Sequence, residues 1–62
     1  MAQLLATAPS LDRLGKMINA YFYSQKKLID IGNGTYEVHG AKGNMASYRV
    51  VKKGRRYRFE QK

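Results

Sequence analysis

The residues with the clearest chemistry lie close together in the C-terminal half of the chain, between Tyr48 and Phe59. This stretch contains six Lys and Arg side chains and no Asp or Glu. Ammonium and guanidinium groups donate charge-assisted hydrogen bonds to phosphate oxygens, and the planar guanidinium group donates them in pairs. The candidate phosphate-binding residues are Arg49, Lys52, Lys53, Arg55, Arg56 and Arg58.

The chain as a whole is basic, with twelve Lys and Arg against four Asp and Glu and a net charge of +8. The charge is uneven, because residues 1–31 carry four basic and two acidic groups (net +2) whereas residues 32–62 carry eight and two (net +6). Such a field attracts polyanions and acidic surfaces. We therefore expect the partner to be a nucleic acid or an acidic protein.

Two non-enzymatic functions fit these charges. In the first, the protein is a nucleic-acid-binding module whose basic β-hairpin, residues 48–59, enters the major groove of DNA or lies along a DNA or RNA backbone. In the alternative, it is a small protein-binding adaptor or inhibitor, of the kind that mobile elements encode, which docks on an acidic partner. A basic hairpin can also be a solvent-exposed edge of the sheet whose charges prevent edge-to-edge aggregation. Composition does not separate these interpretations.

A third interpretation is a weak nuclease or metal site around His39. The expected strand register brings Asp30, Glu37 and His39 together on one face of a sheet, where they could bind a divalent ion or supply a general base. A sheet surface offers no pocket, however, and a salt bridge from Glu37 to the nearby Arg49 would explain the same residues. We therefore expect no enzyme, no cofactor, no metal and no small-molecule substrate.

A helix must support the sheet that carries these groups. After Pro9 and Ser10, apolar residues recur at spacings of three and four, which predicts an amphipathic helix over residues 10–23. Ser10 is the expected N-cap, and Asp12 falls in the first turn, where the helix dipole favours an anion. The expected apolar face is Leu11, Leu14, Met17, Ile18, Tyr21 and Phe22.

After Ser24 the hydrophobic period changes to two, and Asn33-Gly34 is a strong signal for a two-residue hairpin turn. A tight turn there predicts that Ile31 lies opposite Tyr36 and that Ile29 lies opposite Val38. This register places the four apolar side chains on one face of the sheet.

A second hairpin is predicted around Lys53-Gly54, after a strand at 46–51. It sets Val50 opposite Tyr57, Tyr48 opposite Phe59 and Arg49 opposite Arg58. Two like charges directly opposite each other destabilise a sheet unless an anion relieves them, so this pairing favours bound phosphate. Because the aromatic residues alternate with the arginines, they belong to the buried face, and Tyr23 and Tyr21 are the candidates for exposed rings.

The predicted fold class is therefore α+β, with one N-terminal amphipathic helix packed on a three- to four-stranded antiparallel β-meander. Residues 10–62 form the single domain, and residues 1–9 are an N-terminal leader that can be flexible. The centre of the core is expected beneath the helix residues Leu14, Ile18 and Phe22, and it comprises Tyr48, Val50, Tyr57 and Phe59. The chain has no Cys, no signal-peptide pattern and no membrane-length apolar run, so we expect a cytoplasmic protein without membrane contact. Its oligomeric state stays open.

Overall fold

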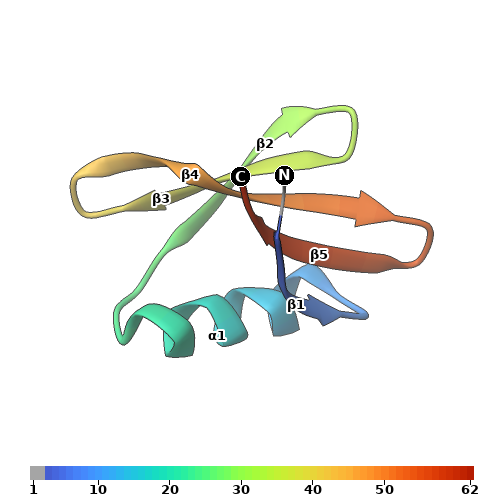
Figure 1. Ribbon diagram of the computed structural model, residues 1–62, viewed down its shortest axis with the longest axis horizontal. Helices are drawn as coiled ribbons and strands as arrows, with labels where there is room; N and C mark the ends of the chain where they lie inside the picture. Colours follow the sequence, from blue (N-terminus) through green and yellow to red (C-terminus); the bar gives the residue numbers. More distant parts are fainter. Residues whose placement is uncertain (1–2) are drawn as a thin grey trace.

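The computed structural model describes residues 3–62, in which one helix packs on a five-stranded antiparallel sheet (Figure 1). The strand order is β1-β5-β4-β3-β2. The α+β prediction is confirmed, with five strands rather than three to four. The elements are β1 (Gln3–Ala8), α1 (Leu11–Phe22), β2 (Lys27–Gly32), β3 (Thr35–Gly40), β4 (Gly43–Lys53) and β5 (Arg56–Gln61).

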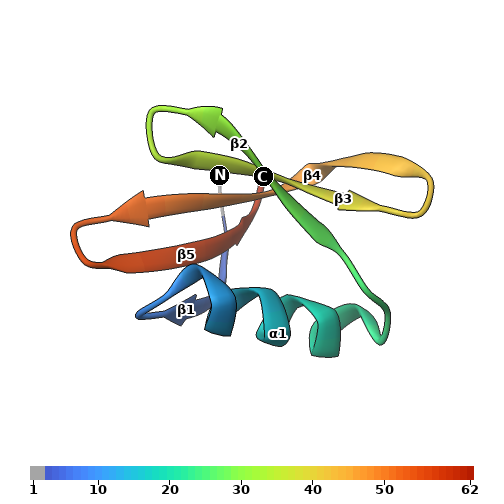
Figure 2. The ribbon, with the colours of Figure 1, turned by 180° about the vertical axis from the view of Figure 1, so that it is seen from behind.

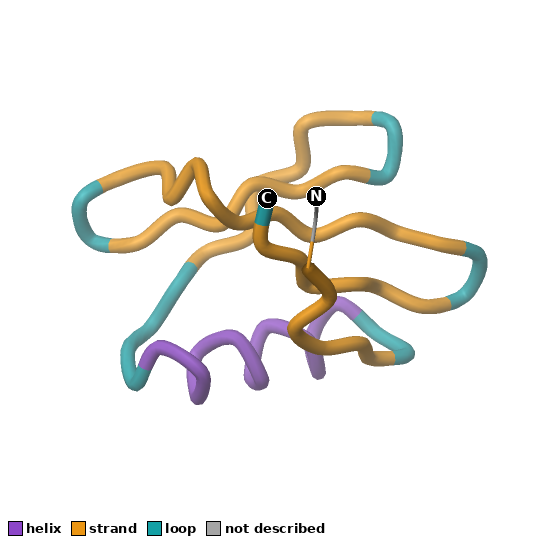
Figure 3. Tube along the Cα trace, in the orientation of Figure 1, coloured by secondary structure: helices purple, strands orange, loops and turns teal. Residues whose placement is uncertain are grey.

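The additional strand, β1, lies within residues 1–9, the stretch interpreted from the sequence as a leader. Residues 1–2 lie outside the described part of the chain. Strand β1 pairs with β5, from Gln3 opposite Gln61 to Ala8 opposite Tyr57, so the two strands lie side by side (Figure 3). The pairing is irregular between Leu4 and Ala6, which breaks the period-two pattern that would have marked the strand.

Helix α1 begins after the predicted N-cap, Ser10, and ends at Phe22, one residue before the predicted end. The Ser10 hydroxyl accepts a hydrogen bond from the Arg13 backbone N–H at 3.2 Å, and Asp12 lies in the first turn. At the other end Tyr23 takes the left-handed conformation, with φ 54°, and its N–H donates to the Ala20 carbonyl. The next N–H, from Ser24, donates to the Asn19 carbonyl, which completes a Schellman cap.

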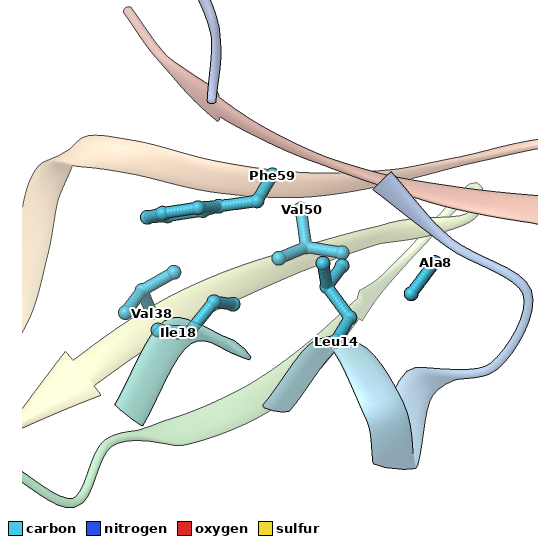
Figure 4. Close-up of a cluster of buried hydrophobic side chains, with 6 residues drawn as sticks. All are labelled: Ala8, Leu14, Ile18, Val38, Val50 and Phe59. Carbon is cyan, nitrogen blue, oxygen red and sulfur yellow. The ribbon is translucent and has the colours of Figure 1, made fainter. Parts of the chain in front are cut away.

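The core lies between α1 and the sheet (Figure 4). Val50 from β4 and Phe59 from β5 are almost fully buried against Leu14 and Ile18 of the helix, as the sequence predicts. The Tyr48 ring stacks beside Phe59, with 5.7 Å between ring centroids. Over residues 3–62, the buried hydrophobic residues are Ala8, Leu14, Ile18, Val38, Val50 and Phe59.

In the β2–β3 hairpin the predicted turn is confirmed but the predicted register is wrong. Asn33 and Gly34 have positive φ angles of 57° and 71° and connect Gly32 to Thr35. A β-bulge between Asp30 and Gly32 then shifts the pairing by one residue, and the Asp30 carboxylate accepts a hydrogen bond from the Gly32 N–H at 2.8 Å.

The bulge exchanges the faces of the β2 side chains. Leu28, rather than Ile29, lies opposite Val38, and Asp30 lies opposite Tyr36. Ile29 and Ile31 are consequently 40% and 53% exposed, so their predicted burial is also wrong.

In the β4–β5 hairpin the turn is Gly54-Arg55, one residue later than predicted, and Lys53 lies opposite Arg56. Gly54, with φ 61°, occupies the first turn position, where type II′ hairpins place glycine. Each residue therefore faces a partner two positions away from the predicted one, so the pairs Val50–Tyr57, Tyr48–Phe59 and Arg49–Arg58 are wrong. The faces are right, because a shift of two residues preserves the alternation of side chains. The observed pairs include Val50–Phe59, Val51–Arg58 and Arg49–Glu60.

Candidate nucleic-acid interface

The β4–β5 hairpin carries all six candidate residues, but the structure divides them into two groups. Arg49 and Arg58 lie within the sheet on the face away from α1, whereas the other four surround the turn. In Figures 1 and 2 this turn projects at one end of the molecule, the end that also holds the β2–β3 turn and the β1–α1 connection. We call Lys52, Lys53, Arg55 and Arg56 the tip cluster.

Glu60 holds the two sheet-face arginines. Its carboxylate accepts hydrogen bonds from Arg49 Nε and Arg58 Nε, each at 3.1 Å, and the residue is only 7% exposed. The two arginine side chains are 38% and 39% exposed. A carboxylate of the chain itself therefore relieves the repulsion between Arg49 and Arg58. An external anion is not needed there, contrary to what the predicted Arg49–Arg58 pairing implied.

The tip cluster has no such partner. Among residues 3–62, no carboxylate lies within salt-bridge distance of its four side chains. Lys53 and Arg56, two like charges, lie directly opposite each other where the strands meet the turn. Lys52 lies over the Tyr57 ring, with its Nζ 5.8 Å from the centroid, and its backbone N–H donates to the Gly34 carbonyl at 2.7 Å. Within residues 3–62, the tip is thus an exposed group of cations without a compensating carboxylate.

Arg56 also belongs to a second group that the sequence did not reveal. Its Nη2 donates to Thr7 Oγ1 at 3.0 Å, which holds the guanidinium at the edge strand β1. There it borders a hollow of about 630 Å³ that Arg13 and Lys16 of α1 also line. We call this the basic hollow; its lining is Thr7, Ala8, Pro9, Arg13, Lys16, Met17 and Arg56.

The sequence offered only a faint signal for the basic hollow. Arg13 and Lys16 are three positions apart and so share one side of a helix, but the same spacing is common on solvated helices. Their proximity to Arg56 depends on β1, which was not predicted.

The constellation predicted around His39 does not form. His39 Nε2 lies 2.9 Å from Glu37 Oε1, and Asn44 donates to the other Glu37 oxygen at 3.4 Å. Asp30 is on the opposite face, because the bulge places it beside Tyr36. Over residues 3–62 no three potential metal ligands lie close enough together to hold an ion.

The exposed aromatic rings are those that the sequence indicated. Tyr23 is 95% exposed and Tyr21 is 50% exposed. Tyr48 and Tyr57 are partly buried against the core, so the hairpin has no row of exposed rings on which bases could stack.

In comparisons with protein-family models, curated proteins and solved structures, we found nothing that matches this chain. Within residues 3–62, α1 has 12 residues and does not have the length and hydrophobicity of a membrane-spanning helix.

Proposed function

We propose that this protein is a small, non-enzymatic binding module that holds the phosphate backbone of DNA or RNA at the tip of its β4–β5 hairpin. The observation that carries the proposal is the tip cluster, four cations that have no carboxylate within salt-bridge distance in the described part of the chain. Keeping Lys53 and Arg56 opposite each other costs stability in the free protein. A polyanion removes that repulsion, because each phosphate accepts hydrogen bonds from these donors.

Arg49 and Arg58 contribute less than the tip cluster in this proposal. Glu60 compensates one of their two charges and orients both guanidinium groups toward itself. Binding that depends on phosphate rather than base contacts carries little sequence information, so we expect weak sequence preference. The proposed compartment is the cytoplasm, on the basis of a chain without cysteine.

The salt dependence of nucleic-acid binding tests this proposal. Four phosphates neutralised by the tip cluster give a log–log slope of about −3.6 on duplex DNA, and further contacts make it steeper. The variant Lys53→Gln/Arg55→Gln removes two cations from the tip and should make the slope shallower by about 1.8. The matched control Lys27→Gln/Lys62→Gln removes the same charge from exposed residues outside the tip cluster.

The control should change affinity much less than the tip variant does. Equal weakening by the two variants would mean that only net charge matters and that the tip is not a site. If neither duplex DNA nor single strands bind at about 0.1 M salt, the nucleic-acid proposal is wrong.

A second candidate function is docking on an acidic protein, as an adaptor or inhibitor. The observation that favours it is the exposure of Ile29 and Ile31 on the edge strand β2. Apolar side chains on an edge strand can contact a protein partner but add nothing to a phosphate contact. Replacing both by Thr should leave DNA binding unchanged under the first function and weaken partner binding under the second.

A further inference from the structure

The basic hollow combines features that the tip cluster lacks. Three elements line this open hollow: β1 with the Pro9 connection, α1, and the start of β5. Its lining, as far as the described residues form it, includes three cations, Arg13, Lys16 and Arg56, and no acidic side chain. A concave surface with fixed cations concentrates an anion more strongly than the same charges on a convex surface.

Arg56 is the best-positioned of these cations. The hydrogen bond from its Nη2 to Thr7 Oγ1 directs the guanidinium across β1 and uses one of its five N–H donors. The remaining donors can bind a phosphate oxygen in pairs. Because its orientation is already fixed in the free protein, little side-chain entropy is lost when a ligand binds.

Lys16 is available to a ligand as well. Its Nζ lies 3.8 Å from the Asp12 carboxylate, but the side chains of both residues are about four-fifths exposed, at 78% and 84%. An exposed ion pair of this kind contributes little free energy, so an incoming phosphate can displace Asp12.

Apart from Thr7, the remaining lining is apolar and comes from Ala8, Pro9 and Met17. Met17 is 43% exposed although it lies on the predicted apolar side of α1. A sugar ring offers carbon atoms next to its phosphate, so the pairing of cations with an apolar wall suits a sugar–phosphate unit better than a free inorganic ion.

We infer that the basic hollow is a second phosphate site and that a bound nucleic-acid backbone runs from the tip cluster through Arg56 into the hollow, across the edge of β1. This inference deepens the proposed function and rests on it. Arg56 links the two groups, since it lies opposite Lys53 in the hairpin and also lines the hollow. The track comprises six cations: Lys52, Lys53, Arg55, Arg56, Arg13 and Lys16.

The first test uses duplex and single-stranded DNA. Six neutralised phosphates give the wild-type protein a slope of about −5.4 on duplex DNA. The variant Arg13→Gln/Lys16→Gln should reduce this to about −3.6, whereas Lys27→Gln/Lys62→Gln should leave it near the wild-type value. Arg13 and Lys16 are exposed, so the fold should survive, and an unchanged melting curve checks this.

The second test uses inorganic phosphate and does not depend on nucleic acid. Backbone amide NMR signals are followed during titration with phosphate, with sodium chloride at equal ionic strength as the reference. The largest phosphate-specific shifts should come from Thr7, Ala8, Arg13, Lys16 and Met17, and the Arg13→Gln/Lys16→Gln variant should lose them.

The outcomes separate the two proposals. If the tip variant weakens DNA binding but the hollow variant behaves like the control and phosphate moves no hollow signal, the inference is wrong and the proposed function stands. Phosphate-specific amide shifts that are spread evenly over all exposed Lys and Arg residues would also show that the basic hollow is not a phosphate site. If the wild-type protein binds no nucleic acid while phosphate still shifts the hollow signals, the backbone path is wrong and an acidic or phosphorylated protein becomes the partner to test.

Discussion

Replacing Glu60 by Gln should destabilise the fold and strengthen polyanion binding at the same time. Among residues 3–62, Glu60 is the charged residue that is buried, with an exposure of 7%. Each of its two carboxylate oxygens accepts a hydrogen bond from an arginine Nε at 3.1 Å. A Gln side chain has the same shape, but its amide nitrogen is a donor and would face the N–H group of one arginine. The change also removes the carboxylate that lies within salt-bridge distance of Arg49 and Arg58.

The size of the effect follows from the burial of the three groups. Breaking a fully buried ion pair costs about 3–5 kcal/mol, and an exposed pair contributes about 0–1 kcal/mol. Because Arg49 and Arg58 are 38% and 39% exposed, water solvates part of each guanidinium. We expect an intermediate loss of about 2–3 kcal/mol, which lowers the melting temperature of so small a domain by about 8–24 °C.

Urea and thermal unfolding measured by circular dichroism test this value, with Glu37→Gln as the matched control. Glu37 loses the same charge, but its side chain is 36% exposed and its hydrogen-bond partner is the His39 ring, so its replacement should cost less than about 1 kcal/mol. In DNA binding, Glu60→Gln should raise affinity more than Glu37→Gln does, because it releases two arginines. Unchanged stability in Glu60→Gln, or an equal loss in Glu37→Gln, would refute the stabilising role of Glu60.

Three further changes have clear expected results. Phe59→Ala should cost about 3–5 kcal/mol, since Phe59 is 1% exposed, and a melting curve close to wild type would contradict the packing described for it. Tyr23→Gly should stabilise the protein by about 0.5–1 kcal/mol, because its φ of 54° favours glycine and its side chain is 95% exposed; a lower melting temperature would count against this. Burial raises the pKa of the Tyr36 hydroxyl above its ordinary 10.0, and Tyr57 and Asp30 raise it further. The folded state then binds the proton more tightly, so this contribution to stability is complete below about pH 10 and is lost as pH rises through the raised pKa. Between about pH 8 and about pH 11, the urea midpoint of Tyr36→Phe should therefore fall less than that of the wild-type protein. An equal fall in both proteins would exclude Tyr36 as the source of this pH dependence.

The elements in which the hydrophobic residues keep one period, helical or alternating, could be predicted from the sequence. The helix over 10–23 and the burial of Leu14 and Ile18 follow from apolar spacing, and Ser10 marks the start. The faces of β4 and β5 also follow, because a turn displaced by one residue shifts the strand pairing by two, which leaves Val50 and Phe59 on the buried side.

The features that the sequence did not predict depend on single side chains or on distant pairings. The hydrogen bond from the Gly32 N–H to the Asp30 carboxylate accompanies a bulge that overrides the alternation of Ile29 and Ile31. For the candidate site, the cations of the hairpin were evident from composition. Which of these cations pairs with a carboxylate could not be predicted, because the pairing of Glu60 with Arg49 depends on the position of the turn.

The pairing of β1 with β5 has a consequence for folding kinetics. The hydrogen bond between Arg56 and Thr7 joins residues 49 positions apart, and closing a loop of that length costs about 3.4 kcal/mol of chain entropy beyond a constant. The local hairpins β2–β3 and β4–β5 do not bear this cost, so β1 should dock last and undock first. Amide hydrogens of β1 should therefore exchange faster than those of β3 and β4. While β1 is undocked, β5 presents an open edge, and at high concentration the β1 of a second molecule can occupy it in a domain-swapped dimer.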